Sequence, residues 1–253
     1  MKAAVISEIG NRFEMEDTHF LDLNFGQKGW VFGGIYDGHG GRFAAQYAAE
    51  YLHENFLEKL DSGLTPGESF IQVYHTISEE LRNQDSGTTA VNFLIQGGEI
   101  FTANAGDARA IVVGAGEYTQ LTVDHRLDNP EERKRIEQGG GRIQYPYTLK
   151  GGRGLMPTRT IGDEYFKSVG IISTPSVNGY TIFREDLILV AACDGLFDVM
   201  NNEEVADLAR RFSEPDELVE RLKREALDYR TGSDNLTIIA VTLNHPRLQD
   251  ERF

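Results

Sequence analysis

The sequence predicts an α+β protein in which helices cover antiparallel sheets. Short apolar runs of strand type recur along the chain, and helical segments come in pairs between groups of these runs instead of alternating with them. No repeat, low-complexity tract or Pro/Gly/Ser linker interrupts the 253 residues. We therefore expect a single domain over residues 1–253.

Six apolar runs have the length and composition of strands. They cover residues 30–36, 88–95, 100–104, 108–113, 187–193 and 236–243. Gly97 and Gly98 stand between the second and third runs, which is typical of a hairpin.

Five segments have helical periodicity or a recognisable helix start. Thr65-Pro66-Gly67-Glu68 is a capping box with proline at the first helical position, and Asn129 and Gly139 mark the ends of another helix. Residues 203–212 and 215–229 predict two more helices. The helix expected at 41–60 has an aromatic stripe, which consists of Phe43, Tyr47, Tyr51 and Phe56.

Charge and composition exclude several classes of partner. The formal net charge is −15, so the surface repels nucleic acid and anionic lipid. A single cysteine, Cys193, excludes an intramolecular disulfide. No signal-peptide segment develops at the N-terminus, and no apolar run approaches the about 18 residues of a spanning helix. We expect a cytoplasmic monomer, with the nucleus as a second compartment and no nucleic-acid or membrane partner.

Four aspartates stand where apolar runs begin or end. Asp37 and Asp194 each end a run, Asp234 almost immediately precedes one, and Asp107 lies between two. A carboxylate at the end of a buried strand is costly unless something compensates its charge. One such residue is usually a turn or a helix cap, but four favour a shared pocket. Oxygen-only ligands would select Mg²⁺ or Mn²⁺ over zinc.

Two basic side chains accompany these aspartates in the sequence. His39, within Asp37-Gly38-His39-Gly40-Gly41, is either a surface histidine or a proton donor to a leaving alkoxide. Arg12 precedes the acidic pair Glu16-Asp17 and suits bidentate contact with a phosphoryl group, although a surface ion pair is the simpler reading.

The chain resembles the metal-dependent protein phosphatases of type 2C through motifs that follow one another along nearly its whole length. Asp37-Gly38-His39-Gly40-Gly41 is similar to the eukaryotic-type branch. The other matches are Arg12-x-x-Met15-Glu16-Asp17, Ser86 to Ala90, Ala103 to Ala110, Leu121-Thr122-x-Asp124-His125, Gly139-Gly140, Thr158-Arg159-x-x-Gly162-Asp163, Ala192 to Val199 and Ser233-Asp234-Asn235.

The resemblance implies an αββα sandwich and a serine/threonine phosphatase, a phosphoric monoester hydrolase that acts on phosphoprotein substrates. It implies two Mg²⁺ or Mn²⁺ ions and a metal-bound hydroxide that attacks phosphorus. Arg12 would hold the phosphate and His39 would be the general acid. The metal-site residues that it implies are Asp37 as the bridging ligand, Asp194, Asp234, the Gly38 carbonyl and Glu16 through water, with Asp107 and Asp198 joining Asp194 at a weaker third-metal site.

One departure and two rival functions qualify this interpretation. Leu155 to Thr160 differs from the family pattern, and the preceding segment 144–154 is loop-like and is expected to form a flap, so substrate choice is the least constrained property. A pseudophosphatase would keep the fold without turnover, and a small phosphoester could replace the phosphoprotein. Cys193 lacks the Cys-x5-Arg pattern of a tyrosine phosphatase nucleophile and is expected to be a buried apolar residue.

Overall fold

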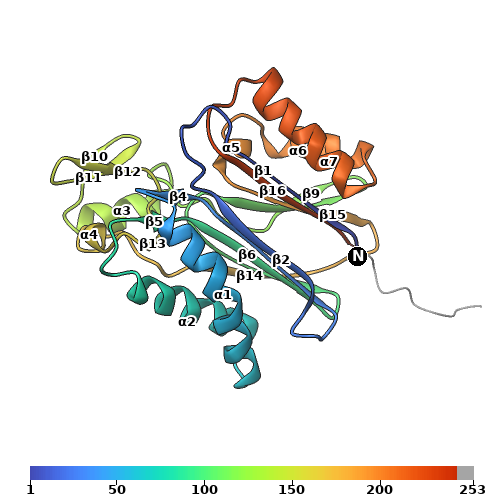
Figure 1. Cartoon of the computed structure of the whole chain (residues 1–253), viewed down its shortest axis with the longest axis horizontal. Coiled ribbons are helices and arrows are strands. Elements are labelled where there is room, and N and C mark those ends of the chain that lie inside the picture. Colours follow the sequence, from blue (N-terminus) through green and yellow to red (C-terminus); the bar gives the residue numbers. More distant parts are fainter. Residues whose placement is uncertain (244–253) are drawn as a thin grey trace, which may run out of the picture.

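The computed structural model of the chain describes residues 1–243, in which two five-stranded sheets lie between two pairs of helices (Figure 1). One sheet has the order β1 (Ala3–Glu8), β16 (Leu236–Thr242), β15 (Asp186–Ala192), β8 (Arg109–Gly114) and β9 (Tyr118–Gln120). The other has the order β14 (Ser176–Thr181), β7 (Glu99–Ala105), β6 (Ala90–Gln96), β3 (Trp30–Tyr36) and β2 (Thr18–Phe25). All neighbouring strands within these sheets are antiparallel.

Helices cover the outer face of each sheet. α1 (Phe43–Asp61) and α2 (Pro66–Glu80) pack on the β3 side, and α6 (Asn202–Arg211) and α7 (Pro215–Lys223) pack on the β16 side. α7 continues into a π-helix, η1 (Arg224–Tyr229). The predicted αββα sandwich is therefore confirmed.

Central strands are buried on both faces because they lie between two apolar layers. In β3, Val31 and Ile35 face the layer between the sheets, whereas Phe32 and Tyr36 face α1 and α2. Both faces of such a strand need apolar side chains, so its sequence is an unbroken apolar run. This explains why apolar runs in the sequence predicted the central strands.

The helix at 41–60 is confirmed as α1, but its aromatic stripe is not the face that packs on the sheet. Phe43 is 47% exposed, and Phe56 is the one member of the stripe that is fully buried. Alanines form most of the buried face, which allows the helix to lie close to the sheet. The buried residues of α1 are Ala44, Ala45, Ala48, Ala49, Leu52 and Phe56.

A smaller lobe projects from one end of the sandwich (Figure 1). It contains α3 (Pro130–Gln138), α4 (Glu164–Lys167) and a three-stranded sheet of β10 (Arg142–Gln144), β11 (Tyr147–Lys150) and β12 (Arg153–Leu155). The expectation of a loop over 144–154 was wrong, because these residues form short antiparallel strands. Short strands β4 (Gly38–His39), β5 (Gly87–Thr88) and β13 (Ile161–Gly162) form another small sheet.

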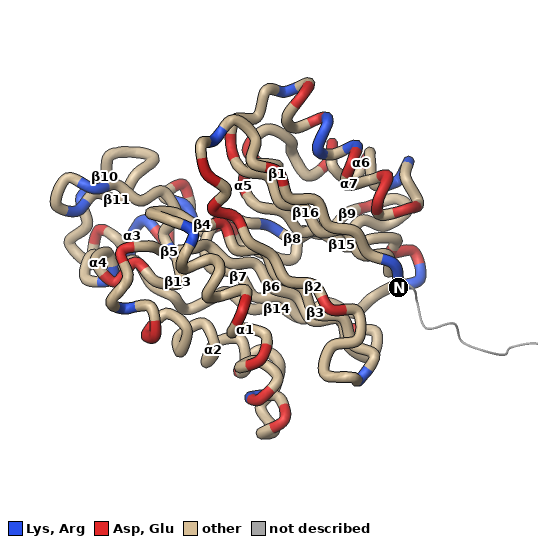
Figure 2. Tube along the Cα trace, viewed as in Figure 1, with Lys and Arg blue, Asp and Glu red and all other residues tan. Residues whose placement is uncertain are grey.

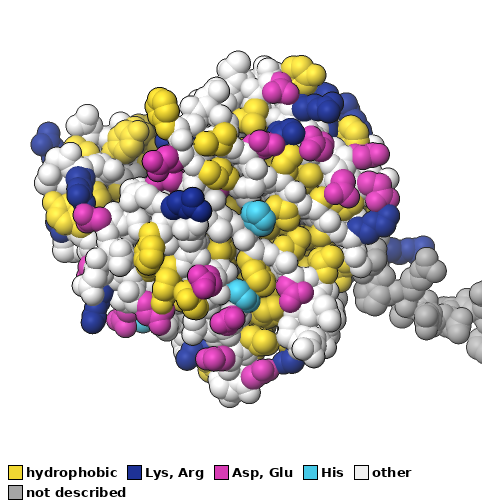
Figure 3. All heavy atoms as spheres, viewed as in Figure 1, with side chains coloured by type: hydrophobic (Ala, Val, Ile, Leu, Met, Phe, Trp, Pro, Cys, Tyr) yellow, Lys and Arg dark blue, Asp and Glu magenta, His cyan; other side chains and the backbone are white. Residues whose placement is uncertain are grey.

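No helix within residues 1–243 has both the length and the hydropathy needed to cross a membrane. On the face shown in Figure 3, acidic and basic side chains are interspersed with hydrophobic ones.

Candidate active site

Four strand ends meet at one pocket. Asp37 follows β3, Asp107 lies between β7 and β8, and Asp234 lies two residues before β16. Asp194 opens the short helix α5 (Asp194–Phe197) just after β15. All four line a cavity of about 770 Å³. Figure 2 shows red acidic segments where α5 and β4 approach one another.

The structure brings together eight of the nine residues that the sequence and the resemblance singled out. Those that line the cavity are Arg12, Glu16, Asp37, Gly38, His39, Asp107, Asp194 and Asp234. Asp198 does not line it, but the Asp198 carboxylate shares the Arg126 side chain with Asp107 and Asp194. Their proximity is a structural fact, and their roles remain predictions.

Burial and neighbouring carboxylates raise the pKa of two aspartates in this pocket. Burial is the largest cause for Asp37 and for Asp194, and both pKa values lie well above the usual range. Repulsion from neighbouring carboxylates, including Asp107 and Asp234, raises both pKa values further. Several oxygen donors that destabilise one another fit divalent cations of the Mg²⁺ or Mn²⁺ type, which would offset this charge.

Two arginines form ion pairs with carboxylates of the pocket. Arg12 Nη2 donates to Asp234 Oδ2 at 2.6 Å, and Arg126 donates to Asp107 Oδ2 at 2.7 Å. Within residues 1–243, no three His, Cys, Asp or Glu side chains are grouped so that they could hold a metal ion as they stand.

The side chain of Asn235 holds the N-terminal part of the site against the start of β16. Asn235 Nδ2 donates to the carbonyls of Ile9 and Glu14 at 2.8 and 3.1 Å, and Asn235 Oδ1 accepts from Glu16 N at 2.9 Å. Glu16 Oε1 in turn accepts from Gly41 N at 2.6 Å. Asn235 therefore positions the segment that carries Arg12 and Glu16, a role that the sequence did not reveal.

Gly38 lies where no side chain fits. A Cβ at this position would come within 2.6 Å of the Glu16 carbonyl oxygen. Glycine therefore lets the turn after Asp37 lie against the segment that carries Glu16. The use of the Gly38 carbonyl as a metal ligand stays a prediction.

His39 forms a pair with a carboxylate that sequence reasoning did not single out. His39 Nε2 lies 2.6 Å from Asp163 Oδ2. Burial lowers the pKa of His39, but the attraction to Asp163 outweighs it, so the pKa is raised overall. The pair fits here because Gly87 has no side chain, since a Cβ would come within 2.0 Å of Asp163 Oδ2. The signal in the sequence was the motif Thr158-Arg159-x-x-Gly162-Asp163, which contains Asp163 but gave it no role. In the structure Asp163 has a left-handed φ of 52°.

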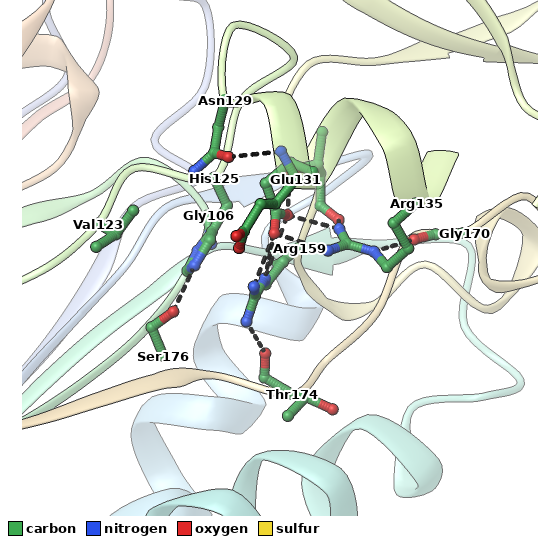
Figure 4. Close-up of polar contacts among 12 residues, drawn as sticks. Gly106, Val123, His125, Asn129, Glu131, Arg135, Arg159, Gly170, Thr174 and Ser176 are labelled. Carbon is green, nitrogen blue, oxygen red and sulfur yellow. Dashed lines mark hydrogen bonds and ion pairs between the residues drawn. The ribbon is translucent and has the colours of Figure 1, made fainter. Parts of the chain in front are cut away.

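A buried ionic cluster supports the site from the smaller lobe (Figure 4). Glu132 of α3 is 1% exposed and accepts hydrogen bonds from Arg135, Arg159 and Thr158. Burial raises the pKa of Glu132, but these hydrogen bonds outweigh it and bring the pKa to about 2. The cluster joins α3 to the chain just before β13 and thereby fixes one wall of the site.

His125 connects this cluster to the Asp107 turn. Its Nε2 lies 2.8 Å from Ser176 Oγ, and its Nδ1 accepts from Gly106 N at 3.2 Å (Figure 4). The pKa of His125 falls to about 3, chiefly because of burial and also because Arg159 lies near. His125 is therefore neutral at physiological pH and acts as a structural link.

The small lobe also forms one side of the cavity. Tyr147 of β11 and Arg153 of β12 line it, together with Met156 and Pro157 of the segment that departs from the family pattern. Arg153 lies over the ring of Tyr165, 5.5 Å from its centroid. The residues that depart from the family pattern therefore lie on the side of the cavity that a substrate would contact.

The αββα fold and the oxygen-rich pocket are the features of a metal-dependent phosphatase. The family model described as "Protein phosphatase 2C" matches residues 2–235. The chain belongs to the protein phosphatase 2C family, whose members are metal-dependent serine/threonine phosphatases.

Curated relatives and solved structures agree with this assignment. The chain is 34% identical over 252 residues to "Probable protein phosphatase 2C 76" of Arabidopsis thaliana, with 96% of this chain and 59% of that protein covered. It is 34% identical to "Probable protein phosphatase 2C member 13, mitochondrial" of rice, with 98% of this chain and 70% of that protein covered. The chain thus spans only part of these relatives.

Structural similarity extends over nearly the whole chain. A serine-threonine phosphatase 2C from Toxoplasma gondii superposes with a TM-score of 0.84 at 23% identity, covering 96% of this chain and 94% of that chain. A C. elegans sex determining protein also gives a TM-score of 0.84, at 25% identity, covering 96% of this chain and 65% of that chain. At 23% identity, the Toxoplasma comparison supports the fold alone.

Proposed function

We propose that this chain hydrolyses phosphoserine and phosphothreonine in proteins at a centre of two Mg²⁺ or Mn²⁺ ions. The observation that carries the proposal is the convergence of Asp37, Asp194 and Asp234 on one cavity beside Arg12 and His39. Family membership supports phosphatase activity, and the raised pKa values of Asp37 and Asp194 support a site that needs cations.

Asp37, Asp194, Asp234 and the Gly38 carbonyl would hold the ions, with Glu16 contacting their waters. Bound cations of this type lower the pKa of a water, so that hydroxide is available near neutral pH. A weaker third ion at Asp107 and Asp198 remains part of the proposal.

The chain's own groups would bind the phosphoryl group and deliver a proton. Arg12 is exposed at the pocket and can exchange its contact with Asp234 for the phosphoryl oxygens, where its planar fork suits bidentate binding. His39, whose pKa Asp163 raises, would carry a proton and give it to the departing serine or threonine oxygen. No covalent phosphoenzyme is needed, and Cys193 is fully buried with a raised pKa, caused mainly by burial.

Within this proposal, the protein acts as a monomer in the cytoplasm or nucleus. The compartment stays a prediction, and the name of one rice relative places that protein in mitochondria.

The test is phosphothreonine-peptide hydrolysis with Mn²⁺, with Mg²⁺ and with EDTA. We expect activity with either ion and none after chelation. Asp194→Ala should abolish turnover, because it removes a ligand. Asp228→Ala is the control, because Asp228 is exposed on η1 and does not line the cavity. Full activity after exhaustive chelation would disprove the metal centre, and a folded protein that binds Mn²⁺ without turnover would indicate a pseudophosphatase.

A further inference from the structure

We propose that Arg126 is a tethered cation that occupies an outer site formed by Asp107 and Asp198, so that a further divalent cation binds there only after the guanidinium leaves. The inference rests on the proposed function, because it presumes that divalent cations bind in the adjoining pocket.

The Arg126 side chain forms ion pairs with three carboxylates. Its Nε lies 2.7 Å from Asp107 Oδ2, and its Nη2 lies 2.7 Å from Asp198 Oδ1. The same Nη2 lies 3.4 Å from Asp194 Oδ2. The planar guanidinium therefore supplies the positive charge that these carboxylates require.

Arg126 and a divalent cation would compete for the same oxygens. Mg²⁺ binds carboxylate oxygens at about 2.0–2.1 Å, which leaves no room for a guanidinium on the same lone pairs. The positive charges would also repel each other across a partly buried space, because the Arg126 side chain is only 25% exposed and that of Asp107 is 2% exposed. Occupation of the outer site by one cation therefore excludes the other.

A second observation indicates that a ligand belongs beside Asp107. Thr89 is 3% exposed and lines the same cavity, and its Oγ1 has no hydrogen-bond partner among the described residues. Thr89 packs directly on the turn that carries Asp107, because a Cβ on Gly106 would come within 2.5 Å of the Thr89 Cβ. A hydrated cation at Asp107 would offer this hydroxyl a water molecule.

The backbone around Arg126 is fixed, so the competition involves its side chain. The preceding residue, His125, is 1% exposed and its N–H donates to the Gly106 carbonyl at 2.9 Å. Asp124 accepts two hydrogen bonds from Arg109. The guanidinium of Arg126 can therefore leave the outer site without moving the segment that bears it.

The experiment is titration of the metal-free protein with Mn²⁺, with binding followed by calorimetry and free Mn²⁺ counted by electron paramagnetic resonance. We compare the wild type with Arg126→Met and Arg126→Lys. The control is Arg133→Met, which removes the same charge from an exposed ion pair with Glu137 on nearby α3. Arg126→Met should bind one Mn²⁺ equivalent more, or bind the weakest one at least tenfold more tightly. Arg133→Met should match the wild type.

Each result supports or overturns a defined statement. Absence of Mn²⁺ binding to every protein would overturn the proposed metal centre itself. If the wild type binds Mn²⁺ and Arg126→Met binds the same number of ions with the same affinity, only the role of Arg126 is overturned. In the double variant Arg126→Met/Asp198→Ala the gain should disappear, and a persistent gain would show that the outer site lies elsewhere.

Arg126→Lys keeps the test decisive if the methionine variant fails to fold. Lysine retains the charge but lacks the fork that reaches Asp107 and Asp198 together. We therefore expect intermediate tightening of the weakest Mn²⁺ step. A folded lysine variant with wild-type Mn²⁺ binding would count against the proposal.

Discussion

At the scale of single residues, Arg12 and His39 are expected to fail in different ways. If Arg12 binds the phosphoryl group equally strongly in the ground state and the transition state, Arg12→Ala should raise KM by roughly 10- to 100-fold. If His39 protonates the leaving oxygen, His39→Ala should lower kcat by about 10²–10⁴-fold with KM nearly unchanged. The measurement is steady-state kinetics on a phosphothreonine peptide.

A second substrate shows whether His39 acts as an acid. p-Nitrophenolate leaves readily without a proton, so the kcat loss of His39→Ala should shrink on p-nitrophenyl phosphate. Equal losses on both substrates would mean that His39 orients water or only packs.

Asp163 is expected to act through His39. Asp163→Asn removes the charged partner of the imidazole, so kcat on the phosphothreonine peptide should fall at least about tenfold. The loss should again shrink on p-nitrophenyl phosphate, which a purely structural defect would not produce. Glu164→Gln is the matched control, because Glu164 is the exposed neighbour and also lines the cavity. A loss independent of the leaving group would remove Asp163 from this role.

The sequence identified the carboxylates of the site but not the residues that position them. Asp37 and Asp194 stand out because a charged residue at the end of an apolar run is unusual, whatever place the strand has in its sheet. Asn235 lies in the motif Ser233-Asp234-Asn235, and Arg126 directly follows the motif that ends at His125, but the sequence assigns neither side chain a role. Their importance comes from the distant segments that they contact. Those contacts depend on the tertiary fold, so the local sequence could not show which partners these side chains bind.

At the scale of secondary-structure elements, the small lobe depends on the buried Glu132. Glu132→Gln would leave Arg135 and Arg159 without their counter-charge, and loss of one partner from a buried ion pair costs about 3–5 kcal/mol. Urea unfolding should show this loss. Glu131→Gln, the exposed neighbour on the same helix, should change stability by less than about 1 kcal/mol. Equal effects of the two substitutions would contradict a structural role for the cluster.

Strands between two apolar layers were predictable, and half-exposed ones were not. The runs at 30–36 and 236–243 correspond to β3 and β16, which are buried almost throughout. β2 and β14 lie at the edges of their sheet and mix exposed with partly buried positions, so they have no continuous apolar run. The capping box at Thr65 involves only residues that are close together in the sequence, so it could be predicted. It begins α2 as expected.

At the scale of the whole molecule, His125 is expected to limit stability in acid. Its pKa is about 3 in the folded protein and about 6.5 when it is free, with Arg159, Glu132 and Arg135 as the charged groups that face it. The unfolded chain therefore binds more protons between these values, so stability falls as pH drops below about 6.5. By pH 5 this contribution should have cost roughly 2 kcal/mol.

Urea unfolding of the wild type and His125→Gln between pH 7.5 and pH 5 isolates this contribution. The difference in unfolding free energy between them should shift against the wild type on acidification. His75→Gln, at an exposed position on α2, should follow the wild type in parallel. A difference that stays constant with pH would show that His125 is not held neutral.

The place of β16 has a consequence for how the chain is made. This strand lies between β1 and β15, so residues 236–241 pair directly with residues 3–8 across the longest sequence separations between paired strands of the described fold. While a ribosome is still adding residue 230, the first strand has no partner on that side, and the segment bearing Asp234 does not yet exist. Contacts so distant in sequence form slowly because a long loop must close first. With Asp234 in its proposed role as a metal ligand, the nascent chain stays catalytically incomplete until almost its last described residues emerge.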